Sequence, residues 1–196
     1  MMTALKGLML ALLLAAGPTH AGAATWEVDP SHTNVGFTVS HLFTSVQGRF
    51  DDVEATIVFD PDHPNETVVR GTVQAVSINT NQAKRDKHLR SADFFDVERF
   101  PTLSFESTEM KAWSGNKGKL AGNLTIHGVT RPIVFDVVYL GQGSDPWGNV
   151  RAGFRATLTV DRKDFGLNWN ELLETGGFLV GDEIEIRIDA EGLLAE

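Results

Sequence analysis

The side chains best able to bind an anion gather in one short polar segment. It holds four permanent cations and one histidine: Lys84, Arg85, Lys87, His88 and Arg90. They stand out because the chain, with 17 basic and 26 acidic side chains, has a formal net charge of −9. Guanidinium and ammonium groups bind phosphate through charge-assisted hydrogen bonds, which would suit a cationic lip for an anionic ligand group. The alternative is a solvated helix face, with Arg85 or Arg90 bonded to backbone or to Asp93.

Residues that would mark catalysis or a resident metal are missing elsewhere. The absence of Cys excludes thiol chemistry, and no Gly-x-Ser-x-Gly nucleophile motif occurs. The Gly-Gln-Gly run at 141–143 leads into Asp-Pro rather than into a helix, so it is a turn and not a phosphate-binding loop. His41 and His127 both end strand-like runs and could meet at a metal, although hydrogen-bonded rim histidines are commoner. We therefore expect no catalytic residue, metal or cofactor.

The cationic segment is predicted to be a short helix. It lacks the alternation of the rest of the chain, and Asn79 or Thr80 could cap a helix that runs to about Arg90. Phe94 and Phe95 follow at once and are expected to dock this helix onto the fold, near one end.

Most of the remaining chain alternates apolar and polar residues, which is the period of a half-buried β-strand. Eight runs show this period, at residues 35–41, 53–59, 69–75, 103–106, 120–126, 133–139, 154–160 and 184–188. Clusters of Gly, Pro, Asn and Asp separate them as turns, notably at 60–65, 114–118, 127–132 and 141–146. Many antiparallel strands in one short all-β domain indicate a β-sandwich or a β-barrel.

The pattern alone does not settle what fills the interior. Inward-facing positions include large rings, such as Phe37 and Phe105, that could fill a core themselves. They also include small residues, such as Gly122 and Ala156, that would leave space along the axis. A closed barrel of about eight strands is just wide enough to hold one narrow ligand. Two loop residues would either line a cavity mouth or cover a barrel end: Trp147 and Trp169.

The first residues form a separate segment with the features of a secretory signal peptide. Lys6 precedes an apolar run at residues 7–17, a proline breaks it, and small residues lead up to Ala23. The run is shorter than the roughly 20 apolar residues of a membrane-spanning helix. We therefore expect a signal peptide over residues 1–23, cleaved after Ala23, and one mature domain over residues 24–196 in the periplasm. The acidic balance argues against nucleic acids and anionic membrane surfaces as partners, and no later segment is apolar enough to span a membrane.

Short motifs follow one another along the chain from Trp26 to its end. They include Asp29-Pro30-Ser31-His32, Asn79-Thr80-Asn81, the run 84–94, Phe100-Pro101-Thr102, the runs 122–132 and 141–148, Arg151-Ala152-Gly153-Phe154, Arg162-Lys163-Asp164-Phe165-Gly166 and Val180-Gly181-Asp182-Glu183. Together they resemble the signature of the YceI-like family of polyisoprenoid-binding periplasmic proteins. The resemblance implies an extended, lipocalin-like antiparallel β-barrel of about eight strands with one short helix near one end. It also implies a long isoprenoid or similar lipid, such as a quinone tail, in an apolar tunnel, and a homodimer.

With that resemblance, apolar residues on inward faces become candidates for the tunnel lining: Val35, Phe37, Val39, Ile57, Phe105, Leu124, Ile126, Phe135, Phe154 and Leu158. The candidates for a headgroup-binding mouth are Arg85, Lys87, His88, Arg90, Phe94 and Phe95. Residues 87 and 90 share one helix face and residues 85 and 88 another, so only one pair can point at the mouth. We expect a passive binding protein and no enzyme. The alternative functions are a lipid-modifying enzyme and a barrel with a filled core that acts as a stress-response or interaction module.

Overall fold

A computed structural model describes residues 22–172, 174 and 176–195, and the predicted signal peptide lies almost entirely outside them. The strands are β1 (Ala24–Val28), β2 (Asn34–His41), β3 (Thr44–Phe50), β4 (Val53–Phe59), β5 (Val68–Gln74), β6 (Ile78–Asn79), β7 (Thr102–Ser114), β8 (Lys117–Ile126), β9 (Val129–Ser144), β10 (Val150–Asp161) and β11 (Val180–Leu194). One α-helix, α1 (Ala83–Arg90), and four short 3-10 turns complete the described part: η1 (Pro30–His32), η2 (Pro64–Glu66), η3 (Ala75–Ser77) and η4 (Arg162–Phe165). Within it, no helix has the length and apolar character needed to cross a membrane.

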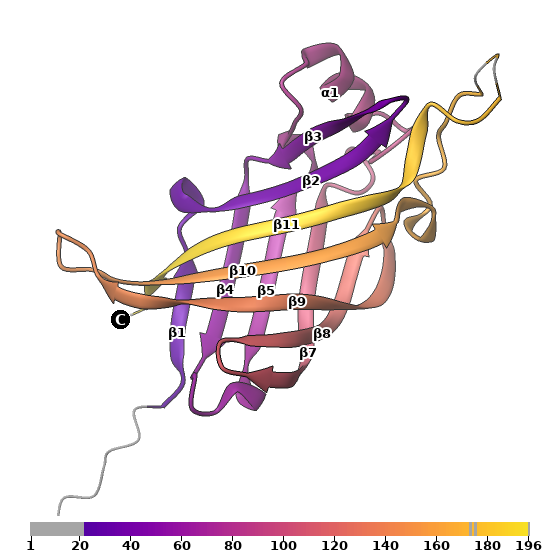
Figure 1. Ribbon diagram of the computed structural model, residues 1–196. Coiled ribbons are helices and arrows are strands. Elements are labelled where there is room, and N and C mark those ends of the chain that lie inside the picture. The colour runs from indigo at the N-terminus through magenta and orange to yellow at the C-terminus, as the bar shows by residue number, and fades with distance from the viewer. Residues whose placement is uncertain (1–21, 173, 175, 196) are drawn as a thin grey trace, which may run out of the picture.

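These strands form one closed antiparallel barrel with eight strand positions, which confirms the predicted fold class. The ring runs β1-β4-β5-β7-β8-β9-β10-β11 and closes where β11 pairs with β1. β1 and β2 both pair with β11, one after the other along the same edge, so together they occupy one strand position. On their other side, β4 pairs with β1 and β3 pairs with β2, so β3 and β4 share the next position. In Figure 1 the strands β9, β10, β11 and β2 cross in front of the more upright β4, β5, β7 and β8.

Short interruptions explain why the described strands outnumber the barrel positions. The 3-10 turn η1 separates β1 from β2, two aspartates at 51–52 separate β3 from β4, and η3 separates β5 from β6. Ala75 was predicted to lie in a strand, but it begins η3 and is fully buried. Each interruption divides one long strand into two consecutive pieces, which are counted as separate strands but occupy one position in the barrel.

The alternation in the sequence gives the register of the sheet. In β8 the even-numbered residues from Gly118 to Ile126 are buried, whereas the residues between them are exposed or half-buried. A strand with one buried face in this way has its register set by that face.

One predicted turn was too long. The segment 127–132 was expected to be a turn, but only His127 and Gly128 form it, with φ angles of 52° and 72°. Positive φ at both central residues is the geometry of a tight hairpin turn that matches the twist of the strands. β9 therefore begins at Val129, and Pro132 lies within it opposite Asn123.

The helix also begins later than expected. Asn79 lies in β6, and Asn81 has a φ of 60°, so the first helical residue is Ala83. Its N-terminal cap is Gln82, whose side chain accepts a hydrogen bond of 2.8 Å from the backbone N–H of Arg85. The predicted end at Arg90 is confirmed.

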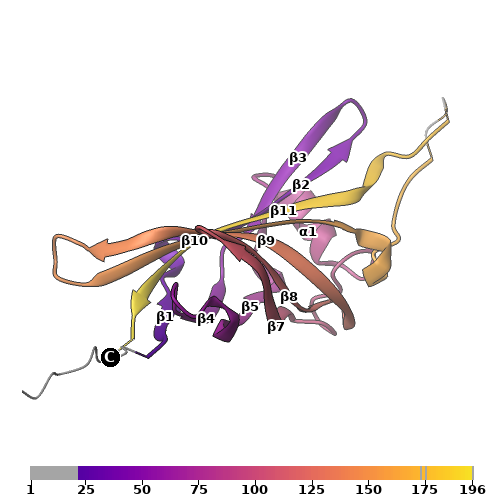
Figure 2. The same cartoon turned by 60° about the horizontal axis from the view of Figure 1, so that its bottom comes forward.

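The barrel has two different ends. At one end lie α1, the β2–β3 hairpin and the described residues of the loop between η4 and β11, which project beyond the strands (Figure 1 and Figure 2). We call this the helical end. At the other end lie the β9–β10 hairpin, the start of β1 and the end of β11. We call this the hairpin end.

Candidate functional site

The interior of the barrel contains a cavity of about 830 Å³ with a mostly apolar lining. Nine of the ten predicted lining residues border it: Val35, Phe37, Val39, Ile57, Phe105, Leu124, Ile126, Phe135 and Phe154. The tenth, Leu158, packs against the surrounding core clusters and is not among the residues that border the cavity. The described structure therefore combines a packed wall with an open space, where the sequence left a solid core and a cavity as alternatives.

The small inward residues do not all create open space. A Cβ atom at Gly122 would lie 2.4 Å from the ring of Phe105, and one at Gly48 would lie 2.3 Å from the ring of Phe37. These glycines accommodate neighbouring rings, because any side chain there would collide with them. The Phe105 ring can then meet Phe135 edge to face, with centroids 5.2 Å apart. This pair forms part of the cavity wall.

The helical end of the cavity carries the cationic side chains, and the structure separates the two predicted pairs. Arg85 and His88 border the cavity, whereas Lys87 and Arg90 do not. The Nε and Nη2 atoms of Arg90 donate hydrogen bonds of 2.7 Å each to the carbonyl oxygens of Val76 and Ile78. Arg90 thus fastens the helix to η3 and β6, the structural role that the sequence had left open.

Arg85 is held in place by Thr80, which the sequence offered only as a candidate helix cap. Its Nε donates to the Thr80 hydroxyl at 2.7 Å, and its Nη2 donates to the Thr80 carbonyl at 2.8 Å. The Thr80 backbone N–H in turn donates to Oδ1 of the buried Asp86 at 2.9 Å, and its hydroxyl is also bonded to that oxygen. Arg85 is therefore positioned while its Nη1 atom makes no described hydrogen bond. Lys84 also borders the cavity, beside it.

A cluster of aromatic rings stands at the same mouth. Phe94 lies 5.1 Å from both His88 and Trp169, measured between ring centroids, and His88 lies 4.8 Å from Trp169. The His88 ring also contacts Asp93, with Nε2 2.9 Å from Oδ2. Phe95 packs edge to face on Phe50 at 5.7 Å. Both predicted aromatics thus border the cavity, and Trp169 lines its mouth.

Trp169 is positioned by a buried arginine that the sequence did not reveal. Arg162 is 3% exposed and donates hydrogen bonds to the carbonyl oxygens of Leu167, Trp169 and Gly181. Its Nη2 also lies 3.2 Å from Oδ1 of Asp182. A buried charge is stable only when it is paired and hydrogen-bonded, as here. Burial of this arginine depends on partners up to twenty positions away along the chain, so no local pattern signals it.

The hairpin end of the cavity is lined by a cluster of aromatic rings. The Phe59 ring packs on Trp113, Tyr139 and Phe154, with centroids 5.3, 4.9 and 5.7 Å away. Burial raises the pKa of the Tyr139 phenol. Trp26, 1% exposed, belongs to the same apolar cluster.

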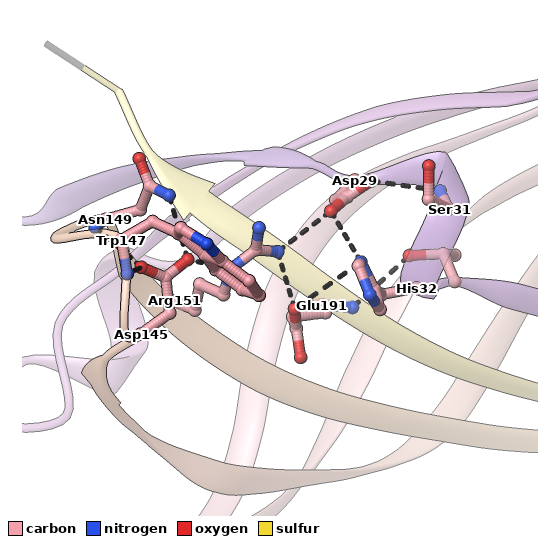
Figure 3. A network of polar contacts seen from close by, with 9 residues as sticks. Asp29, Ser31, His32, Asp145, Trp147, Asn149, Arg151 and Glu191 are labelled. Atoms are coloured by element: carbon pink, nitrogen blue, oxygen red, sulfur yellow. Dashed lines mark hydrogen bonds and ion pairs between the residues drawn. The ribbon is translucent and has the colours of Figure 1, made fainter.

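A network of charges lies at the same end (Figure 3). Nη1 of Arg151 lies 2.8 Å from Asp29 and 2.6 Å from Glu191, and its Nε lies 2.8 Å from Asp145. The Arg151 guanidinium, with His32 as a second donor at Asp29, holds the pKa of the Asp29 carboxyl well below its usual range. Hydrogen bonds from Arg151 and then Asn149 lower the pKa of Asp145 in the same way. Trp147, 82% exposed, lies in the adjoining loop and does not border the cavity.

This network supplies the only described group of three ligand atoms close enough for a metal ion, from Asp29, His32 and Glu191. The guanidinium of Arg151 already bridges Asp29 and Glu191, so the positive charge that a metal would bring is in place. In the described part, His41 and His127 join no such group. His41 borders the cavity, and the His127 ring packs on Phe100 at 4.5 Å.

The fold and its cavity define the class of protein as a closed, eight-stranded, lipocalin-like β-barrel with an apolar interior. A model of the YceI-like domain matches residues 26–192. A UPF0312 protein of Pseudomonas paraeruginosa is 40% identical over 195 residues, which cover 96% of this chain and 98% of that protein. A UPF0312 protein of Pectobacterium atrosepticum is 40% identical over 159 residues, 81% of this chain and 82% of that protein. The chain belongs to the YceI-like family.

Solved structures agree on the fold. BcnA of Burkholderia cenocepacia superposes with a TM-score of 0.75 at 22% identity, over 84% of this chain and 98% of BcnA. The YceI protein of Campylobacter jejuni superposes with a TM-score of 0.64 at 30% identity, over 77% of this chain and 86% of that protein. A polyisoprenoid-binding domain of Saccharophagus degradans, implicated in plant cell wall breakdown, has a TM-score of 0.64 at 14% identity, over 88% of this chain and 99% of the domain.

Proposed function

We propose that this protein is a periplasmic carrier that sequesters one long-chain lipid with an isoprenoid tail inside its barrel. The observation that carries the proposal is the apolar cavity of about 830 Å³. That volume lies within the roughly 300–1,000 Å³ typical of ligand pockets. Membership of the YceI-like family supports the same ligand class, as does the shared fold of a domain described as polyisoprenoid-binding.

Burial of the tail supplies the affinity in this proposal. Each CH₂ group moved from water into the cavity contributes about 0.8 kcal/mol, so a long tail needs few polar contacts. The ligand has a preferred direction in this proposal, because the cations border the cavity at the helical end and the rings of Phe59, Tyr139 and Phe154 line it at the hairpin end. The tail would lie toward this end and the head would remain at the helical end.

The head of the ligand would then meet Lys84, Arg85 and His88, which border the cavity at the helical end. A phosphate would accept hydrogen bonds from Arg85 and Lys84. A quinone head would instead stack on the aromatic cluster that includes Trp169. Both heads fit the side chains present, and the experiment below identifies the one that is carried.

Export and assembly complete the proposal. The signal-peptide features of residues 1–23 lead us to place the mature protein in the periplasm, with cleavage after Ala23. N-terminal sequencing of the protein from the periplasmic fraction would test this. The homodimer implied by the family resemblance stays a prediction, which light scattering of the purified protein would check.

Native mass spectrometry tests the carrier function directly. The precursor is expressed in a Gram-negative host, purified without detergent and sprayed intact. We expect a mass excess that disappears after organic extraction, with the extracted lipid identified by fragmentation. Ala156→Trp fills the cavity from a bordering position and should abolish the mass excess, whereas Leu140→Trp, on the outer face and 52% exposed, should retain it. An empty wild-type barrel, or equal occupancy in both variants, would refute the carrier function.

A further inference from the structure

Two loops at the helical end expose large apolar side chains. Phe43, in the turn between β2 and β3, is 98% exposed, and Leu42 beside it is 48% exposed. In the loop before β11, Leu172 is 78% exposed and Phe178 is 57% exposed. The loops adjoin, because the backbone N–H of Leu42 donates to the Leu179 carbonyl at 3.1 Å. Both project beyond the barrel in Figure 1 and Figure 2. We call these four side chains the apolar tips.

The apolar tips are continuous with the cavity mouth. Val46, three residues after Phe43, borders the cavity, and so do Leu179 and Val180, which directly follow Phe178. A lipid tail that moved between the cavity and the tips would therefore stay against apolar side chains. At the hairpin end, by contrast, the exposed Trp147 adjoins an ion network and does not border the cavity.

The area of the tips limits what can cover them. Two phenylalanines and two leucines at these exposures offer on the order of 500 Å². A stable protein interface buries about 800 Å² on each partner. Side chains at the ends of projecting loops also form no flat face for a second protein. A lipid bilayer needs neither a large nor a flat contact, because it deforms around inserted side chains.

We propose that the apolar tips insert into a lipid bilayer and hold the cavity mouth against it while a lipid enters or leaves. This docking rests on the proposed carrier function, because its role is to let the carried lipid enter and leave the cavity. Charge contributes little to the docking, since the exposed Lys84 and Lys87 on α1 are offset by the exposed Glu171 and Glu174 in the neighbouring loop. Docking should therefore occur on neutral vesicles and depend little on salt, which agrees with the acidic balance of the chain.

Vesicle flotation tests the docking with a matched pair of aromatic substitutions. The full mature protein is mixed with phosphatidylcholine vesicles, and the bound fraction is measured for wild type, Phe43→Ser and Trp147→Ser. Both side chains are more than four-fifths exposed, at opposite ends, so neither change should unfold the barrel. We expect Phe43→Ser to weaken partition at least about tenfold and Trp147→Ser to leave it unchanged. A Phe43→Trp variant should gain fluorescence that brominated acyl chains quench.

Three results would overturn the docking. One is wild-type protein that does not float, and another is equal loss in the two serine variants. The third is a stable dimer in solution that Phe43→Ser dissociates, because the tips would then be a subunit interface. Native mass spectrometry of the same samples keeps the two proposals apart. Phe43→Ser that retains its lipid but loses flotation supports the docking, whereas an empty wild-type cavity with intact flotation would refute only the carrier function.

Discussion

The two ends of the barrel use opposite chemistry around the same set of strands. At the hairpin end, aromatic rings pack against one another and an arginine joins three carboxylates above them. At the helical end, rings line an opening, cations point toward it, and apolar side chains project into solvent. The first arrangement pairs its charged groups within the chain, although Nε1 of the buried Trp26 has no hydrogen-bond partner. The second leaves several groups without a described partner, which is the arrangement expected where another molecule binds.

One barrel thus combines groups that stabilise the fold with groups that are available for binding. Aromatic rings that pack against one another, as at the hairpin end, stabilise the fold whether or not a ligand is present. Side chains such as Phe43 and Lys84 contribute little to folding, because they are exposed. Substitutions at the hairpin end should therefore change the free energy of unfolding, and substitutions at the helical end should change binding.

The largest effect is expected when the same residue type is truncated at both ends. Phe59→Ala removes a ring that is 4% exposed and contacts three others, and should cost about 3–5 kcal/mol. Phe43→Ala removes a ring that is 98% exposed and should change stability by less than about 0.5 kcal/mol. Urea unfolding followed by circular dichroism measures both. Similar losses of stability at the two positions would show that the two ends do not differ in their contribution to folding.

A smaller difference in stability is expected between substitutions of two cations on α1, Arg90 and Lys87. Arg90→Gln removes charged donors from the carbonyls of Val76 and Ile78 and should cost about 2 kcal/mol. Lys87→Gln, on an exposed position without a described ion pair, serves as the control and should cost nothing measurable. If Arg90→Gln keeps wild-type stability while ligand affinity falls, then Arg90 belongs to the mouth and not to the attachment of the helix.

These cations also show where sequence reasoning stops. The spacing of residues 85, 87, 88 and 90 established that two pairs lie on different faces, but the choice between the faces depended on where η3 and β6 place their carbonyls. The buried Arg162 gave no signal for the same reason, because its acceptors come together only in the folded loop.

The strands were easier to predict than the site. Alternation directly reports which face of a strand is buried, so eight strand positions and nine cavity-bordering residues followed from it. Leu158 was predicted to line the cavity and does not border it. Alternation distinguishes inside from outside, but it cannot distinguish a packed interior from an open one. The bends at η1 and η3 were missed because each leaves the alternation on either side intact.

Acid should weaken the hairpin end. The pKa values of Asp29 and Asp145 are depressed in the folded state, so their ion pairs with Arg151 stabilise the fold fully above their ordinary pKa of about 3.9. That stabilisation is lost as the pH falls below about 4 toward the depressed values. Arg151→Gln should lower the melting temperature at neutral pH and make its further fall below about pH 4 shallower than in wild type.

Hydrogen exchange at about pH 3 locates the loss. Amides in residues 24–33 and 145–151 should exchange faster, while those in α1 change less. Melting curves of wild type and Arg151→Gln that run parallel down to this pH would mean that the network contributes no pH-dependent stability.

The smallest effect is expected from two lysines on α1, and it tests the cationic lip itself. Lys84 borders the cavity and Lys87 does not, yet both are exposed and three residues apart on one helix. Lys84→Gln should weaken a phosphate-headed isoprenoid by about 0.5–1 kcal/mol, the magnitude of an exposed charge pair, and leave a neutral quinone unaffected. Lys87→Gln should change neither. Because exposed charges are screened, the difference should shrink as salt rises. Competition binding of each variant with each of the two lipids, at low and at high salt, measures these affinities. Equal losses for the charged and the neutral lipid would show that Lys84 acts through the shape of the mouth and not through its charge.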